Sequence, residues 1–271
     1  MVSILLALAC SPGNPEVHDT GELPLPWACE GDHDGTIVAS ELAAVPGLSV
    51  PYLVNAPGTT AAVDPAGSEV DGELTWDFTG GPEVPVDLDV VEPADAWFAE
   101  HFPAASHAAP MFAHATDLLG VFASSDSSVD LLGLVSRDPA PAVGRTLVVY
   151  DTAVPVMRFP LSVGSTWSAD TTFSDADILG VKNAGEEHYA FEVDAAGTAL
   201  LPGFTIDQTL RLQVELEQTF AISVGPPTVS TLQVLFVREC VGELARMVSL
   251  PDEDDPSFSL ASEFRRLDTE H

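Results

Sequence analysis

Apolar and polar residues alternate with a period of two over several strand-length segments of the chain. The clearest is the segment 204–223, where leucine or valine occupies every even position from Leu210 to Leu216 and polar side chains fill the odd positions between. The segment Val84 to Glu92 likewise places acidic residues on one face and Val or Leu on the other. Such alternation predicts strands with one buried and one wet face, which is typical of antiparallel sheets.

Other segments extend this β pattern across the chain. We expect strands at 48–55 and 72–78 that pair with each other, and a hairpin around Ser124 to Ser128. Further strands are expected at 145–168, where a turn leads to Trp167, and at 188–197 and 230–250. The predicted fold class is therefore mainly β, with antiparallel sheets in a curved half-barrel or sandwich and a short N-terminal EF-hand-like loop and helix.

Composition changes along the chain divide it into expected regions. Residues 1–9 predict a signal peptide and residues 10–26, rich in Gly, Pro and acidic residues, a flexible tether. The remaining ranges are 27–47 for the loop, 48–138 for a first β-rich unit, 139–250 for an antiparallel sheet unit and 251–271 for an acidic tail. We expect the tail to form a short helix or a disordered end. Sequence periodicity leaves open whether the two β units form one domain or two.

The loop EGDHDGTIVASE, Glu30 to Glu41, has the spacing of an EF-hand calcium loop, with Gly35 at its turn position. A helix-compatible stretch, Val38 to Ala44, follows it, whereas prolines disfavour a helix before it, so it is half an EF-hand. The alternative is an acidic turn whose charges stay solvated. The predicted ligands of a calcium ion are Glu30, Asp32, Asp34, Thr36 through its backbone carbonyl, and Glu41.

The charge of the chain restricts its partners. Its 271 residues include 42 acidic against 9 basic residues, for a net charge of −33, and 46% apolar residues suffice for a packed core. Such a field repels phosphate backbones and anionic lipid surfaces, so nucleic acid is not an expected partner. Calcium is a natural counterion of such a chain.

The first ten residues, MVSILLALAC, form an apolar run that ends in a cysteine. They resemble the lipobox of bacterial lipoproteins. The resemblance implies cleavage before Cys10, lipidation of its sulfur and a lipid anchor in a membrane of the cell envelope, on the outer-membrane, periplasmic or surface side. The alternative is a buried N-terminal strand or helix; the run is too short to span a bilayer, which needs about 20 residues.

If Cys10 is acylated, Cys29 and Cys240 remain as one even pair in an oxidising compartment. We therefore predict a disulfide that clips the calcium loop onto the main domain. The alternative is two separate buried thiols.

Several motifs together carry a wider resemblance: the lipobox, the cysteine before a DxDG-type loop, LLGLVS, RFPLSVGSTW and VRECVGELARMVS. In combination they resemble predicted lipoproteins of myxobacteria and related bacteria. The FPLxVGxxW turn before a large antiparallel sheet is also similar to periplasmic lipoproteins built as curved half-barrels, some of which carry lipids. This similarity implies a curved sheet with an apolar concave face.

Catalytic motifs are not evident in the sequence. It contains no GxSxG elbow, HExxH helix, glycine-rich phosphate loop or CxxC pair, and the intervals of His101, His107 and His114 fit no common face for zinc. We therefore expect a binding protein, not an enzyme. The first hypothesis is an exported, lipid-anchored protein that binds a structural calcium ion. The alternative is a carrier of a lipid or other hydrophobic ligand, and an envelope protein is a further candidate partner.

Overall fold

The computed structural model describes residues 29, 31–42, 44–222 and 227–269. The predicted signal peptide, Cys10, the tether and Glu30 lie outside the described residues. Among the residues described, no helix has the length and apolar character needed to cross a membrane.

The described residues form strands joined by loops and three short 3-10 helices. The strands are β1 Ser49–Val54, β2 Ala61–Ala62, β3 Ser68–Val70, β4 Glu73–Asp77, β5 Val84–Asp89, β6 His107–Pro110, β7 Leu118–Ser124, β8 Ser128–Ser136, β9 Leu147–Arg158, β10 Thr166–Ile178, β11 Val181–Leu201, β12 Phe204–Phe220, β13 Thr228–Arg238, β14 Gly242–Ser249 and β15 Leu260–Leu267. The 3-10 helices are η1 Ala39–Glu41, η2 Ala99–His101 and η3 Ala113–Ala115. The mainly β, antiparallel class predicted from the sequence is confirmed.

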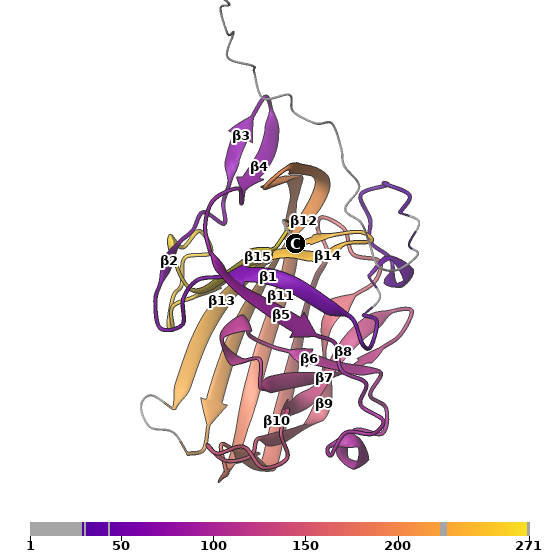
Figure 1. Ribbon diagram of the computed structural model, residues 1–271, viewed down its shortest axis with the longest axis vertical. Coiled ribbons are helices and arrows are strands. Elements are labelled where there is room, and N and C mark those ends of the chain that lie inside the picture. The colour runs from indigo at the N-terminus through magenta and orange to yellow at the C-terminus, as the bar shows by residue number, and fades with distance from the viewer. Residues whose placement is uncertain (1–28, 30, 43, 223–226, 270–271) are drawn as a thin grey trace, which may run out of the picture.

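One sheet contains these strands and nearly closes on itself. Its order is β5-β1-β15-β14-β13-β12-β11-β10-β9-β8-β7-β6. The two end strands meet where Val91, just after β5, bridges Ala108 of β6 through backbone bonds of 2.7 and 3.0 Å. The result is a barrel-like sheet, in which β9 to β13 run along the long axis while β1 and β5 cross in front of them (Figure 1).

The inner face of the long strands carries the largest apolar cluster. The even positions of β12 from Leu210 to Leu216 are buried there, as the alternation predicted, beside Phe191 of β11 and Leu235 of β13. Full burial of one such side chain contributes about 1.5–3 kcal/mol. The predicted alternation therefore decides which face of each strand points into the barrel.

A second cluster covers the outer face of the same sheet. Trp76 of β4 is fully buried there, donates its indole N–H to the Pro65 carbonyl at 3.2 Å, and packs on Phe236 of β13 with ring centroids 5.0 Å apart. Val234 also points to this face. Because this part of β13 is buried on both faces, its sequence VLFV, Val234 to Val237, is a continuous apolar run and lacks alternation.

The structure tests two predictions about strand pairing. The hairpin around Ser124 to Ser128 is confirmed as β7 and β8. The pairing of 48–55 with 72–78 is wrong, because β1 lies between β5 and β15 while β4 pairs with β3 and, in parallel, with β11. Alternation specifies the buried face of a strand but not its neighbour.

The tail was expected to be a helix or a disordered end, and this is wrong for Leu260–Leu267. That segment is β15, with hydrogen-bonded neighbours β14 and β1 on its two sides. Its buried Glu263 and Arg265 side chains have hydrogen-bond and ion-pair partners, as described below. Tertiary pairing thus overrides a local pattern that reads as a solvated end.

The short helix expected after the acidic loop is a single 3-10 turn, η1. The Val38 backbone N–H donates to the Glu41 carboxylate at 2.9 Å, and Leu42 leaves helical geometry with φ −131°. No α-helix occurs among the described residues, so the EF-hand arrangement of loop and helix is not formed.

Candidate ligand cavity and acidic cluster

A cavity of about 310 Å³ lies inside the barrel-like sheet. Much of its wall is apolar and comes from the inner faces of several strands: Val50, Leu88, Phe122, Leu131, Val156, Phe191, Leu212, Val214 and Leu235. This volume falls at the lower end of the range of about 300–1,000 Å³ found for small-molecule sites. A hollow of about 600 Å³ also exists, but it is lined by loop residues 79–83 and their neighbours, and it lacks such an apolar wall.

One polar part of the wall comes from β13, β14, β15 and β1. In the strand register Leu235 faces Arg246, and Arg246 faces Arg265, so both guanidinium groups project from the inner face with the cavity-lining residues. Arg265 donates through Nε to the Glu243 carboxylate at 2.6 Å, and Arg246 through Nε at 2.9 Å. These ion pairs are buried, with side-chain exposures between 4 and 16%.

The electrostatic balance of this wall favours the charged form of Glu243. Burial alone would raise the pKa of Glu243, but the guanidinium groups of Arg246 and Arg265 outweigh it, and the pKa stays below its usual value. Burial lowers the pKa of Arg246, and the positive charge of Arg265 adds to that effect, while Glu243 opposes it. One carboxylate is therefore shared between two cations at the cavity surface.

A second carboxylate, Glu263, lies behind this wall and is held mainly by backbone groups. It accepts the N–H groups of Ala113 and His114 at 3.0 and 3.1 Å, and Arg265 Nη1 at 3.4 Å. Glu263 is 4% exposed and does not line the cavity. The charged groups that do line it are thus two arginines and one glutamate.

Gln233 of β13 also lines the cavity and is 9% exposed. Its side-chain amide makes no hydrogen bond to any described residue. The amide is not fully enclosed by protein, because its atoms face the cavity. It is therefore available to hydrogen-bond with water or another molecule there.

One further polar group of the wall, the Tyr189 hydroxyl, already has a partner. Tyr189 and Tyr150 both donate to the buried Glu187 carboxylate at 2.6 Å, and Gln218 donates to it at 2.7 Å. Burial, followed by the neighbouring Glu187 charge, raises the pKa of Tyr189. This network holds β9, β11 and β12 together, and its hydroxyl groups are committed to Glu187.

His107 of β6 also forms part of the cavity wall. Its ring stacks on Phe122 with centroids 5.1 Å apart, and its Nδ1 lies 2.9 Å from the Ser106 hydroxyl. Burial lowers the pKa of His107 to about 4. At neutral pH this imidazole is uncharged, so it adds no positive charge to the cavity.

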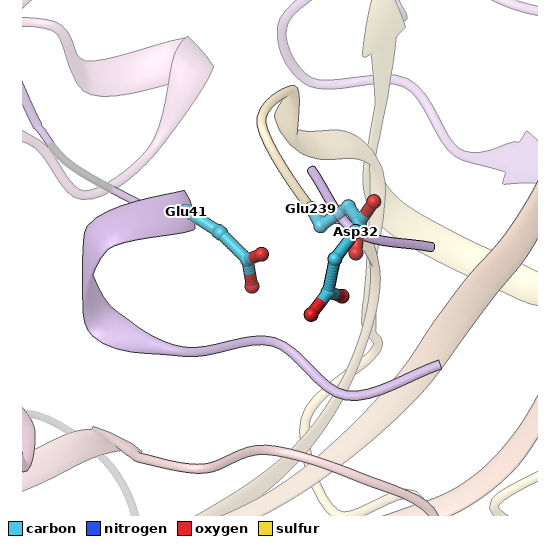
Figure 2. Close-up of side chains that lie close together, drawn as sticks. All are labelled: Asp32, Glu41 and Glu239. Carbon is cyan, nitrogen blue, oxygen red and sulfur yellow. The ribbon is translucent and has the colours of Figure 1, made fainter. Parts of the chain in front are cut away.

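The predicted calcium ligands are brought together only in part. Asp32 and Glu41 meet Glu239, from the turn between β13 and β14, and one carboxylate oxygen of each lies within 4.8 Å of the others (Figure 2). Asp34 instead accepts the Thr36 backbone N–H at 2.7 Å. Glu239 was missed by the sequence analysis. Its signal was its place beside Cys240, since the predicted disulfide brings it to the loop.

That disulfide is confirmed: Cys29 and Cys240 are bonded, with Cα atoms 5.5 Å apart. Gly31 permits the close approach, because a Cβ there would lie 2.2 Å from a Glu239 carboxylate oxygen. The Glu239 carboxylate also accepts the His33 backbone N–H at 3.0 Å and pairs with Arg238 at 3.0 Å. The cluster supplies three carboxylates, and oxygens of Glu239 and Glu41 already accept backbone N–H groups. With one oxygen from each carboxylate, the 6–8 oxygens that calcium takes would require water or backbone oxygens in addition.

In comparisons with known proteins, the chain matches no protein-family model, no curated protein and no solved structure.

Proposed function

We propose that the protein binds a hydrophobic small molecule inside its barrel-like sheet and acts as a carrier in the cell envelope. The observation that supports this most is the cavity of about 310 Å³ with a largely apolar wall. Displacing water from apolar surface gains roughly 25 cal/mol per Å². A molecule with an apolar chain is therefore the ligand class that this wall favours.

Titration with the neutral fluorescent probe N-phenyl-1-naphthylamine tests the proposal. Val156 of β9 lines the cavity, whereas Val149 on the same strand is 40% exposed. Val156→Phe fills part of the cavity and should weaken probe binding at least tenfold, while the matched Val149→Phe should leave it unchanged. Absence of probe binding by the parent protein, or equal binding by both variants, would overturn the proposal.

We propose, as a second function, that the acidic cluster binds a calcium ion. The convergence of Asp32, Glu41 and Glu239 supports it, since three carboxylates repel one another unless a cation neutralises them. Arg238 already pairs with Glu239, so a bound ion would compete with that contact. We expect weak, structural binding of the kind seen in extracellular modules, at roughly 0.1–1 mM.

Thermal unfolding in EGTA and in millimolar calcium tests this second function. Calcium should raise the melting temperature of the parent protein, and Glu41→Gln, whose amide oxygen still accepts the Val38 N–H, should abolish the rise. Asp34→Asn distinguishes the cluster from the linear loop: the rise should persist, because Asp34 lies outside the cluster. A parent protein indifferent to calcium would show that the carboxylates form only an acidic turn.

Lipid anchoring at Cys10 remains part of the proposal for the full chain. Intact-mass analysis of the membrane-extracted protein should show a chain that begins at Cys10 and carries acyl groups. A soluble protein that retains residues 1–9 would contradict it.

A further inference from the structure

The polar wall of the cavity gives the proposed ligand a second chemical feature. Gln233 and Arg246 lie on the inner face of adjacent strands: Gln233 faces Val248, two residues beyond Arg246. Such diagonal neighbours have backbones about 7–8 Å apart, within reach of a group that lies between two long side chains. Both line the same cavity.

Each of the two side chains has hydrogen-bonding capacity to spare. The Gln233 amide has no partner among the described residues, although the residue is 91% buried, as follows from its exposure of 9%. Arg246 uses Nε and Nη2 on Glu243, and its Nη1 makes no hydrogen bond to a described residue. Two unused N–H donor groups therefore lie on adjacent strands in the wall of a largely apolar cavity.

The charges at the cavity surface favour an anion over a cation. Arg246 and Arg265 line the cavity with one carboxylate, Glu243. Glu263 does not line it; it accepts two backbone N–H groups and pairs with Arg265 at 3.4 Å. The net charge of −33 opposes an anion at long range, but salt screens this repulsion beyond about 10 Å at 0.1 M. Close hydrogen bonds to a guanidinium group are screened much less.

From this juxtaposition we infer that the ligand is an amphiphile, whose anionic oxygen head group accepts hydrogen bonds from Arg246 and Gln233 while its apolar chain packs on the opposite wall. This inference rests on the proposed function, since it assigns the ligand class of the same cavity. Carboxylate and phosphate heads share the required chemistry. Gln233 and Arg246 are the residues that determine specificity.

Displacement of N-phenyl-1-naphthylamine by amphiphiles of equal chain length tests the inference. Myristate and tetradecyl phosphate supply the two anionic heads, tetradecanol a neutral head and tetradecylamine a cationic one. We expect at least one anion to bind about tenfold or more tightly than the alcohol, because a hydrogen bond to a charged group contributes about 1.5–3 kcal/mol. The relative affinity of the two anions identifies the head group.

Gln233→Leu is the sharpest variant because it removes no side-chain hydrogen bond to a described residue. It should reduce the preference for the anion over the alcohol severalfold, while the unliganded protein unfolds at the same or a higher denaturant concentration. Arg246→Met should abolish the preference. Gln213→Leu on the outer face of β12, where Gln213 donates to Asp194, is the control and should leave the preference unchanged.

The outcomes separate the two proposals. If the probe and all four amphiphiles fail to bind, the proposed function itself fails. If they bind but the alcohol or amine binds as tightly as both anions, or if Gln233→Leu and Arg246→Met keep the parent preference, the anionic head group is refuted and the cavity is an apolar site only.

Discussion

His107 predicts a specific pH dependence of the free energy of unfolding. Burial holds its pKa at about 4 in the folded protein, against 6.5 in the unfolded chain. Above pH 6.5 the imidazole is neutral in both states, so the stability is fully present. As the pH falls from 6.5 towards 4, the unfolded chain binds a proton at this imidazole but the folded protein does not, so the free energy of unfolding decreases.

The magnitude follows from the width of this window. One unit of pKa difference corresponds to about 1.36 kcal/mol, so a difference of about 2.5 units removes about 3 kcal/mol between pH 6.5 and 4. Glu243 contributes separately: its pKa is lowered in the folded state, so its stabilisation is lost only at lower pH, below its ordinary value near 4.5. The range from pH 6.5 to 4.5 therefore separates the effect of His107 from that of Glu243.

Urea denaturation at a series of pH values measures this effect on the unliganded protein. His107→Asn, which keeps a polar group near the position of Nδ1, should remove the slope: the difference between its curve and the parent curve should change by roughly 2–3 kcal/mol across the window. Taking the difference cancels the repulsion among the many carboxylates, which both proteins share. His101→Asn, at a more exposed site, controls for loss of an imidazole. Parallel curves for the parent protein and His107→Asn would refute the reasoning.

Three further changes test the packing and the covalent frame. The double variant Cys29→Ser, Cys240→Ser opens a crosslink of sequence separation 211, and in the chain-entropy model it should lose about 5 kcal/mol in urea denaturation; a loss below about 1 kcal/mol would contradict that model. Trp76→Ala should cost about 3–5 kcal/mol by the same assay, because the indole is fully buried between sheet and loop, and a near-neutral result would show that β4 does not pack there in solution. Gly133→Ala places a Cβ 2.0 Å from the Val148 carbonyl oxygen and should cost about 1–3 kcal/mol or more, whereas an unchanged denaturation midpoint would exclude this close approach of β8 and β9.

The candidate site could be anticipated only where its residues are close in sequence. Asp32 and Glu41 were identified from loop spacing, and the structure brings their carboxylates together. Glu239 lies more than 190 positions further along the chain and arrives through the disulfide. The sequence pattern around Gln233 and Arg246 does not predict the cavity, because they are single polar residues in two apolar strands. Only the strand register shows that they share a face.

The sequence by itself determined the β class, the buried face of strands such as β12, the β7–β8 hairpin and the cysteine pair, because each depends on side-chain alternation, a short turn or a count of thiols. Tertiary structure alone decided which strands are neighbours, that Leu260–Leu267 enters the sheet between β14 and β1, and that the ends of the sheet meet at Val91 and Ala108. These features depend on hydrogen bonds and ion pairs between segments far apart in the chain. Alternation along a single strand does not encode such partners, and it is their arrangement that creates the cavity.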